Sequence, residues 1–336
     1  MCELSISAII LTFNEELHIR RCLENAFKVA KDVFVIDCYS TDKTVEIAKK
    51  MGAVVLQNKW VNYATQFNWG LDNAPIKTKW VLRFDADEYL EDDLIEEIQT
   101  KLPNEPEEVT GIEFHLKVKF LNKWMKHASP SVILMRLFRY GIGHSEVRLM
   151  DEHIVLSEGI SKTYNGAFVD HNLNNITWWA QKHIGYAKRE AADLLNIEYD
   201  FSDASGKDHV EGQAGGKRAL KNKYAQKKLF WRSFAYFLYR YFYKRGFLDG
   251  KEGFLWCFMQ GWWYRTLVDI QVYQIKQECQ NKPQLIEDYL KYQFGKEFLK
   301  HESDKHRGGV IYSVEFRVDS LALACCRSLI ERREAA

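Results

Sequence analysis

The chain has 336 residues, enough for one large domain or for a domain with an appendage. Its 47 Lys and Arg residues nearly balance its 46 Asp and Glu residues, so it lacks the global basic field of a nucleic-acid-binding protein, and we expect no nucleic-acid partner. Its seven cysteines show no CxxC pair, which excludes a zinc ribbon and a disulfide framework and is typical of free thiols in a reducing compartment.

Strand and helix patterns alternate through the first quarter of the chain. Apolar runs predict four buried strands, at 5–12, 33–37, 53–56 and 79–84. Helical spacing and N-cap clusters predict helices between them, at 14–27, 43–51 and 62–71. This alternation predicts an α/β fold with a mainly parallel central sheet and helices on both faces. Because the N-terminus runs directly into the first strand, we expect no signal peptide.

The pattern changes after residue 102. Longer strands are predicted at 109–120 and 132–138, a short strand at 154–156, and a helix at 178–196. Residues 200–216 are rich in Gly, Ser, Asp and Lys, which is typical of an exposed loop. We therefore expect a sheet domain over 1–200, a linker over 201–216, a C-terminal helical region over 217–300 and a tail of unknown role over 301–336.

Trp, Tyr, Phe, Lys and Arg dominate residues 217–273. Segments 230–243 and 254–264 are too short or too charged to span a bilayer, so we expect no membrane-spanning helix. They suit helices that associate with a membrane by lying in its interface, with aromatic rings at headgroup depth. The cations expected to face anionic lipid are Arg232, Arg240, Lys244 and Arg245. The alternatives are a helical hairpin that packs on the sheet domain and a dimer interface.

The stretch 79–90, KWVLRFDADEYL, runs from a buried strand into the carboxylates of Asp85, Asp87 and Glu88. In open α/β sheets, ligands bind at the carboxyl edge of the strands. Clustered carboxylates at such an edge are typical ligands of a hard divalent cation, Mg²⁺ or Mn²⁺. The sequence therefore predicts a metal on Asp87, shared with Asp85. The alternative is an acidic turn that caps the next helix.

Two further strand ends are expected at the same edge. Thr12, Asn14 and Glu15 follow the first strand, and Asp37 and Asp42 follow the second. Together with a metal that holds a diphosphate, these side chains predict a nucleotide pocket. The first strand–helix turn lacks GxGxxG, which disfavours a dinucleotide site, and it lacks the Gly-rich basic loop expected of a nucleotidyltransferase.

Four segments carry a resemblance to a known family: AIILTFNEELHIRRCLENA, VFVIDCYSTDKTVEIAKKMGA, ATQFNWGL and WVLRFDADEYL. They resemble the family 2 glycosyltransferases, inverting enzymes with the Rossmann-like GT-A fold, and are most similar to the branch of lipopolysaccharide-core and exopolysaccharide sugar transferases. The resemblance continues through MRLFRYG, LMDEHIVL and RGFLDGKEGF and covers residues 5–273. In one departure, the family's Gln-Arg-Asn reads Gln66-Phe67-Asn68 here, so this helix offers the donor no cation.

The resemblance implies a donor site at this sheet edge. The residues implied to contact the nucleoside are Thr12, Asn14, Glu15 and Asp37, with Asp42 in support. Asp85 and Asp87 would form the DxD pair, which meets the diphosphate of a nucleotide sugar through Mg²⁺ or Mn²⁺. His171, which follows an apolar stretch, could add a metal ligand; the alternative is a structural histidine.

Sugar transfer also needs a base that takes the proton of the acceptor hydroxyl. Where related enzymes often read hydrophobic-His-Glu, this chain has Met150-Asp151-Glu152-His153. Glu152 aligns with that Glu and is the predicted base, with Asp151 as the fallback; the alternative is a solvated turn between two strands. Arg136 and Arg139 are predicted to bind the diphosphate or an anionic acceptor, and the alternative for both is surface ion pairing.

These implications describe a metal-dependent, inverting glycosyltransferase. We expect it to move a sugar from a nucleotide-diphosphate sugar, with a UDP-sugar favoured, to a glycan hydroxyl on a lipid-linked acceptor, in cell-surface polysaccharide or lipopolysaccharide biosynthesis. We expect a cytoplasmic protein, peripheral on the inner face of the plasma membrane. The alternatives are a sugar nucleotidyltransferase and a non-catalytic glycan- or lipid-binding relative.

Overall fold

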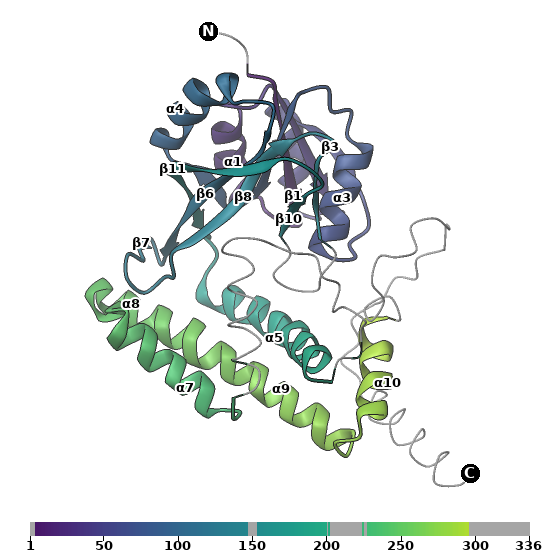
Figure 1. Ribbon diagram of the computed structural model, residues 1–336, viewed down its shortest axis with the longest axis vertical. Coiled ribbons are helices and arrows are strands. Elements are labelled where there is room, and N and C mark those ends of the chain that lie inside the picture. The colour runs from purple at the N-terminus through teal and green to yellow at the C-terminus, as the bar shows by residue number, and fades with distance from the viewer. Residues whose placement is uncertain (1–3, 147–152, 200, 202–223, 225–226, 296–336) are drawn as a thin grey trace. The chain divides into compact units, whose positions relative to one another are not determined.

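The computed structural model describes residues 4–146, 153–199, 201, 224 and 227–295 (Figure 1). The chain forms two compact units. Residues 1–182 and 234–262 belong to the first unit, and residues 183–233 and 263–336 belong to the second. The first unit therefore combines the predicted sheet with part of the predicted C-terminal helical region.

Four parallel strands form one half of the sheet in the first unit. They are β1 (Ile6–Thr12), β2 (Asp32–Asp37), β3 (Val54–Gln57) and β4 (Trp80–Asp85), in the order β3-β2-β1-β4. Every residue of β1 is buried, because the sheet is covered on both faces. A strand covered on both faces has a nearly continuous apolar run rather than an alternating pattern. The four strands predicted in this half are confirmed.

The other half of the sheet is mixed, and its order continues β4-β8-β6-β11-β5 with β7 on β6. Its strands are β5 (Glu88–Leu90), β6 (Val109–Phe120), β7 (Lys123–Trp124), β8 (Val132–Arg139) and β11 (Ile160–His171). Strand β8 is antiparallel to both β4 and β6, whereas β11 is parallel to β6. The prediction of a mainly parallel sheet therefore holds for the first half only. The chain returns from β6 to β8 without a crossover helix, so the strand direction reverses.

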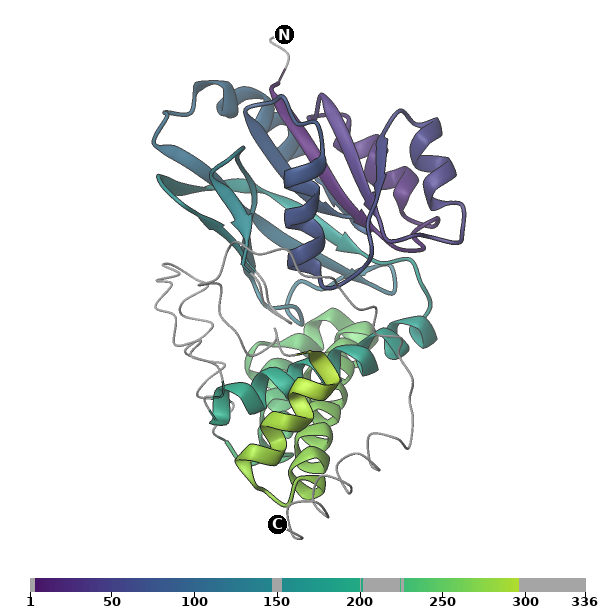
Figure 2. The ribbon, with the colours of Figure 1, turned by 90° about the vertical axis from the view of Figure 1, so that its right-hand side faces the viewer.

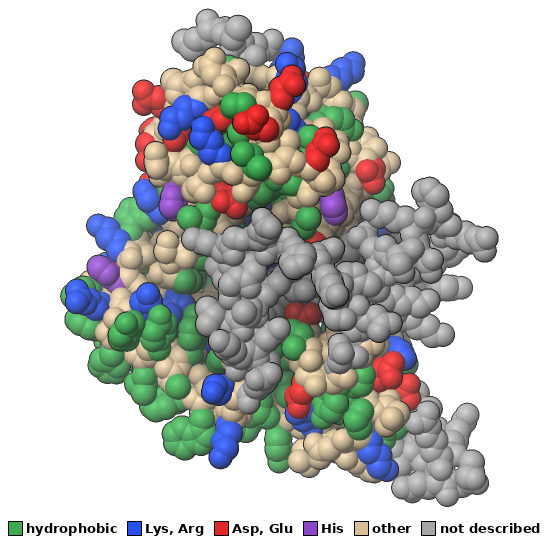
Figure 3. Space-filling view, in the orientation of Figure 1, with side chains coloured by type: hydrophobic (Ala, Val, Ile, Leu, Met, Phe, Trp, Pro, Cys, Tyr) green, Lys and Arg blue, Asp and Glu red, His purple; other side chains and the backbone are tan. Residues whose placement is uncertain are grey.

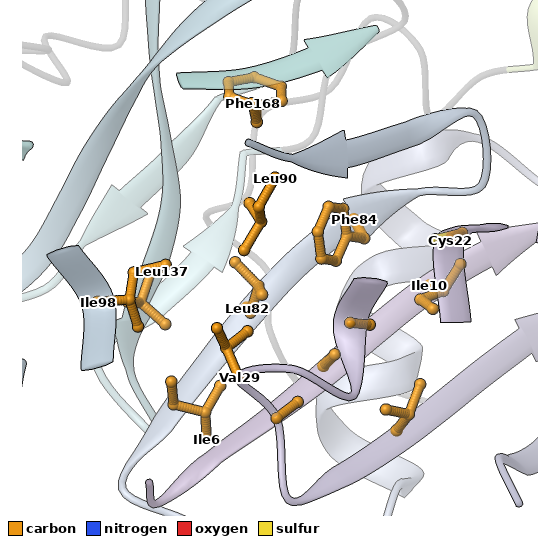
Figure 4. Packing of buried hydrophobic residues seen from close by; sticks show 14 of the residues in the cluster. Ile6, Ile10, Cys22, Val29, Leu82, Phe84, Leu90, Ile98, Leu137 and Phe168 are labelled. Atoms are coloured by element: carbon orange, nitrogen blue, oxygen red, sulfur yellow. The ribbon is translucent and has the colours of Figure 1, made fainter. Parts of the chain in front are cut away.

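Helices cover both faces of the sheet, as predicted (Figure 1; Figure 2). The helices of the sheet region are α1 (Ile19–Ala26), α2 (Thr44–Lys50), α3 (Tyr63–Asn73), α4 (Asp92–Lys101) and the short 3-10 helix η1 (Leu102–Asn104). Helices α1, α2 and α4 contribute to one core, in which Leu82 and Phe84 of β4 lie with Cys22 of α1 and Ile98 of α4 (Figure 4). Helix α3 builds the core of the opposite face.

A small second sheet is formed by β9 (Gly143–Ser145) and β10 (Ile154–Leu156), which pair antiparallel. Asn68 of α3 anchors β9, because its Nδ2 donates to the carbonyl oxygen of Ser145 and its Oδ1 accepts from the N–H of Ser145, both at 2.8 Å. Residues 147–152, which connect the two strands, lie outside the described residues.

Residues 234–262 form a helical segment of the first unit. It comprises the end of α7 (Trp231–Leu238), the π-helix η2 (Tyr239–Tyr243), the 3-10 helix η3 (Gly246–Asp249), α8 (Gly250–Trp256) and most of the π-helix η4 (Cys257–Trp263). Phe237 packs in one cluster with Val118 of β6. Asp249 Oδ2 accepts from the N–H groups of His127 and Ala128 at 2.8 and 2.7 Å. The segment therefore packs beside the end of β6.

Two of the four cations predicted to face lipid are buried. Arg232 pairs with Asp269 at 2.5 Å, and both side chains are almost completely buried. Arg240 donates to the hydroxyl of Tyr236 at 2.9 Å and is 5% exposed. The prediction is wrong for these two residues because internal acceptors bind their guanidinium groups. The exposed members of the set are Lys244 and Arg245. In the part of the chain that the structure describes, no helix combines the length and apolarity needed to cross a membrane.

The second unit is helical where it is described. Its helices are α5 (Ile176–Tyr199) from His183 onward, the start of α7, α9 (Tyr264–Glu278) and α10 (Pro283–Phe294). Glu190 of α5 accepts from the hydroxyl of Tyr264, and Asp269 of α9 accepts from the N–H of Phe230 at 2.7 Å. Helix α5 confirms the helix predicted at 178–196.

Candidate active site

The carboxyl ends of β1, β2 and β4 meet at one edge of the sheet. Thr12, the last residue of β1, is in register with Asp37, the last residue of β2. Leu11 is in register with Asp85, the last residue of β4. Thr12 Oγ1 also donates to Asp37 Oδ1 at 3.1 Å. The structure therefore brings together the three strand ends that the sequence pattern places at one edge.

Asp37 organises the turn that follows β2. Its side chain is fully buried. Its Oδ1 accepts from the hydroxyl of Ser40 as well as from Thr12, and its Oδ2 accepts from the N–H of Ser40 at 2.9 Å and from Gln57 Nε2 at 3.0 Å. Because both oxygens are occupied, a nucleoside base reaches Asp37 only by replacing one of these hydrogen bonds.

Asn14 and Asp42 join the turns that follow β1 and β2. Asn14 has a left-handed backbone with φ 55°, which Asn adopts more readily than most residues. Its Oδ1 accepts from the N–H of Thr41 at 2.8 Å, and Asp42 Oδ2 accepts from the N–H of Glu16 at 3.1 Å. The left-handed residue interrupts helical geometry, so α1 begins at Ile19 rather than near Asn14 as predicted.

Glu15 is bound by a histidine that the sequence patterns did not single out. His18 is fully buried, and its Nδ1 lies 2.6 Å from Glu15 Oε2. Its Nε2 accepts from the N–H of Leu173 at 2.8 Å, so the ring proton lies on Nδ1 and is donated to Glu15. The available signal was the spacing of three residues between Glu15 and His18 at the start of a helix.

The acidic turn after β4 is paired with a buried arginine. Arg136 of β8 forms an ion pair with Glu88 and lies 3.5 Å from Asp85 Oδ2. Burial opposes ionisation of Asp85, but the charges of Arg136 and Arg83 outweigh it and hold the pKa of Asp85 below its usual value. Asp85 is therefore a carboxylate at neutral pH, and Arg136 lies beside this first Asp of the predicted DxD pair.

Arg139 lies far from this turn. Its Nε and Nη2 donate to the carbonyl oxygens of Val109 and Pro106 at 2.9 and 3.0 Å, and its guanidinium carbon lies 4.6 Å from the ring centroid of Trp80. Because β8 is antiparallel to β4, Arg139 is in register with Trp80 at the amino end of β4. Five strand residues, about 16 Å, separate that position from Asp85. The prediction that Arg139 binds the diphosphate is therefore wrong.

His171 uses both ring nitrogens in hydrogen bonds. A guanidinium can only donate, so Nδ1 accepts from Arg21 Nη1 at 2.9 Å, and Nε2 donates to Asn122 Oδ1 at 2.8 Å. Burial, followed by the charge of Arg21, lowers the pKa of His171 to about 4, so the ring is neutral at pH 7. Neither nitrogen offers a lone pair to a cation in this arrangement, which contradicts the prediction that His171 is a metal ligand.

Asp85 and Asp87 remain the candidate metal ligands. Among the described residues, no group of three or more His, Cys, Asp or Glu side chains is placed to hold a metal ion. Mg²⁺ is usually held by one or two carboxylates together with substrate phosphates rather than by an all-protein cage. Asp87 Oδ2 accepts from Asn172 Nδ2 at 2.9 Å, while within the described ranges Asp87 Oδ1 accepts no hydrogen bond. The two carboxylates therefore fit a cation that is shared with a bound diphosphate.

Asp170, near the end of β11, adds a fourth carboxyl group to the region of Asp85, Asp87 and Glu88. It is in register with Glu88 of β5. Burial, followed by the charge of Asp87, raises the pKa of Asp170 to about 7. Asp170 is therefore only partly ionised near pH 7, and a cation bound at Asp85 and Asp87 would favour its charged form.

The predicted base belongs to a segment that the structure does not describe. Glu152 and Asp151 lie outside the described residues, between β9 and β10.

The helix that anchors β9, α3, carries Phe67 where the resemblance predicts Arg. Phe67 is fully buried in the core, and the guanidinium carbon of Arg83 lies 5.3 Å from its ring centroid. The position is therefore an apolar core position in this chain.

Comparison with known proteins identifies the proteins that this chain resembles. Residues 7–154 match the model of Glycosyl transferase family 2. An uncharacterized glycosyltransferase of Rickettsia typhi is 25% identical over 268 residues, which are 74% of this chain and 80% of that protein. The chain spans 31% to 33% of the length of three other rickettsial glycosyltransferases that it matches.

Two further proteins carry functional names. A dolichyl N-acetyl-α-D-glucosaminyl phosphate 3-β-D-2,3-diacetamido-2,3-dideoxy-β-D-glucuronosyltransferase of Methanococcus voltae is 30% identical over 122 residues, 32% of this chain and 37% of that protein. One solved structure is that of glucosyl-3-phosphoglycerate synthase from Mycobacterium tuberculosis in complex with Mn²⁺ and uridine diphosphate. It is 18% identical to this chain with a TM-score of 0.28, and the match covers 34% of this chain and 44% of that one. A TM-score of that size does not establish a shared fold. Residues 7–154 therefore match glycosyl transferase family 2, and the relatives that this chain resembles are glycosyltransferases.

Proposed function

We propose that the protein is an inverting glycosyltransferase that moves a sugar from a nucleotide-diphosphate sugar, with a UDP-sugar favoured, to a hydroxyl group of a glycan. The observation that carries the proposal is the sheet edge of this family 2 domain, where Thr12, Asp37 and Asp85 end neighbouring strands. Such an edge is the usual ligand-binding position of an open α/β sheet. It also combines polar groups suited to a nucleoside with carboxylates suited to a metal-bound diphosphate.

The two parts of the donor are assigned to the two ends of this edge. The residues proposed to contact the nucleoside are Thr12, Asn14, Glu15 and Asp37, with Asp42 holding the turns together. Asp85 and Asp87 would hold Mg²⁺ or Mn²⁺. Arg136 supports this assignment because its charge keeps Asp85 ionised.

The transfer is a displacement at the anomeric carbon. The acceptor oxygen attacks from the face opposite the diphosphate, so a new C–O bond forms as the bond to the diphosphate breaks, through an oxocarbenium-like transition state. Glu152, with Asp151 as the fallback, takes the hydroxyl proton as general base. A bound divalent metal would neutralise the negative charge that develops on the leaving diphosphate. The products are the inverted glycoside and a nucleoside diphosphate.

The acceptor is proposed to be a lipid-linked glycan, presented at the inner face of the plasma membrane. Support comes from eight exposed large apolar side chains between residues 238 and 255 of the first unit, five of them aromatic: Leu238, Tyr239, Phe242, Tyr243, Phe247, Leu248, Phe254 and Leu255. Phe242 and Tyr243 are 59% and 75% exposed, and Lys244 and Arg245 follow them directly. Figure 3 shows hydrophobic side chains with Lys and Arg among them over α7 and α8. Aromatic rings beside cations suit the interface of an anionic membrane. The name of the Methanococcus voltae relative also includes a dolichyl phosphate, a lipid carrier.

Slow transfer of the sugar to water tests the reaction without a known acceptor. UDP-, GDP- and dTDP-sugars are incubated with Mn²⁺, and proton NMR follows the released sugar and its first-formed anomer. We expect release of one nucleoside diphosphate with an inverted sugar, and loss of that release in Glu152→Gln. Binding of a donor without any release would support a non-catalytic relative. Pyrophosphate release from a nucleoside triphosphate and a sugar phosphate would support a nucleotidyltransferase.

A further inference from the structure

The start of α1 is tied to the turn that follows β11. Glu15, His18 and Arg21 recur at intervals of three residues, which brings them to one side of the β1–α1 segment. His18 Nδ1 binds Glu15, and its Nε2 accepts from the N–H of Leu173. Arg21 Nη1 donates to His171 Nδ1. The residues assigned to the nucleoside and the turn after β11 are therefore joined by direct hydrogen bonds.

Arg21 also binds the backbone of the second Asp of the DxD pair. Its Nη2 donates to the carbonyl oxygen of Asp87 at 2.9 Å and to the carbonyl oxygen of His171 at 2.7 Å. The N–H of His171 donates to the same Asp87 oxygen at 3.1 Å. One guanidinium thus holds the peptide groups of Asp87 and His171 together, and its carbon lies 5.1 Å from the ring centroid of Tyr89.

The same turn restrains the side chain of Asp87. Asn172 Nδ2 donates to Asp87 Oδ2 at 2.9 Å. The carbonyl and one carboxylate oxygen of Asp87 are therefore held, and Oδ1 is the oxygen that accepts no hydrogen bond from the described residues. A planar guanidinium can bridge three acceptors in a fixed geometry, which a lysine ammonium at the end of a flexible chain does not reproduce.

We propose that Arg21 is a positioning residue for the donor diphosphate: by fixing the peptide group of Asp87 against the turn after β11, it directs the Asp87 carboxylate toward the metal-bound diphosphate. The inference rests on the proposed function, because it takes Asp87 to be a metal ligand. Residues that orient metal ligands typically change metal affinity by about 10- to 100-fold when they are removed. His18 contributes by holding Leu173, the next part of the same turn.

The test compares Arg21→Met and Arg21→Lys with Arg20→Met, which removes a neighbouring exposed cation from the same helix. Calorimetry gives the Kd of the nucleoside diphosphate that the wild type binds, among UDP, GDP and dTDP, once with Mn²⁺ and once with EDTA. Circular dichroism and thermal unfolding confirm that each variant is folded.

We expect Arg21→Met to weaken binding with Mn²⁺ by about 10- to 100-fold and to leave binding in EDTA unchanged. Arg21→Lys should show a smaller loss of the same kind, and Arg20→Met none. An unchanged Mn²⁺-dependent Kd in folded Arg21→Met, or an equal loss with Mn²⁺ and with EDTA, would overturn the positioning role. Failure of the proposed donor site itself is distinct, because the wild type would then show no Mn²⁺-dependent binding.

Discussion

Replacing Arg136 with Met tests the buried charges behind the candidate metal ligands. The side chains of Arg136 and Glu88 are 9% and 5% exposed, and Asp85 Oδ2 lies 3.5 Å from Arg136. Removing one partner of a buried ion pair leaves the other uncompensated, which costs about 3–5 kcal/mol. We therefore expect Arg136→Met to lower the free energy of unfolding by about 3–5 kcal/mol. The double variant with Glu88→Gln should recover most of that loss, because it leaves one buried charge fewer.

The pH dependence of this variant has a definite sign. Burial raises the pKa of Glu88 well above the usual 4.5, and the charge of Arg136 opposes the shift, so removing Arg136 raises the pKa further. Above about pH 4.5 a folded protein with a raised Glu88 pKa binds a proton that the unfolded chain releases, so its stability falls as the pH rises. Because the pKa is higher in the variant, its stability falls over a wider pH range than that of the wild type. Urea unfolding at pH 5 and pH 8, followed by tryptophan fluorescence, measures the difference. A loss below about 1 kcal/mol, the range of an exposed ion pair, or an equal loss in the double variant would refute the reasoning.

Two further changes test the packing and the membrane contact. In Gly166→Ala the new Cβ would lie 2.5 Å from the Leu94 Cα, so we expect thermal unfolding to show a loss of stability of about 1–3 kcal/mol. The control is Gly185→Ala in an exposed helix, where the new Cβ would meet no atom within 4 Å, so this variant should be as stable as the wild type or more stable. Equal stability of the two variants would contradict the close contact at Gly166. Replacing Lys244 and Arg245 with Ser should weaken pelleting with anionic liposomes by about 30-fold, at about 1 kcal/mol for each cation. Replacing Lys77 and Lys79, two exposed cations of the same unit, is the control, and equal pelleting of both variants would instead support a protein interface.

The first half of the sheet and its ligand edge could be predicted because the information is local. Each buried strand is a short apolar run, and each run ends in polar residues, so Thr12, Asp37 and Asp85 fall at one edge once the strands are parallel. The orientation of β8 depends on its pairing with β4 and β6, which are distant in sequence. For the same reason the sequence predicts the same role, binding of the diphosphate or an anionic acceptor, for both Arg136 and Arg139. On a strand, however, two residues that are three positions apart have side chains on opposite faces of the sheet.

The remaining differences come from partners that are far away in sequence. Arg232 is buried because Asp269 lies beside it, 37 residues later in the chain. Arg21 donates to His171 across 150 residues, so the sequence near either residue does not predict this hydrogen bond. The bond occupies a ring nitrogen of His171, which is why His171 is not a candidate metal ligand. A periodic helix pattern shows that a side chain lies on a given face, but it does not show which distant backbone groups that face meets.

Calorimetric titration of UDP-, GDP- and dTDP-sugars, with Mn²⁺ and with EDTA, tests the central claim most directly. The proteins are wild type, Asp87→Ala and, as a control, Asp72→Ala, which removes an exposed carboxylate from α3 of the same unit. We predict that wild type and Asp72→Ala bind one donor in a Mn²⁺-dependent manner, and that Asp87→Ala loses this dependence while it remains folded. Mn²⁺-dependent binding that survives in Asp87→Ala, or no binding of any donor by the folded wild type, would contradict the donor site proposed at this edge of the sheet.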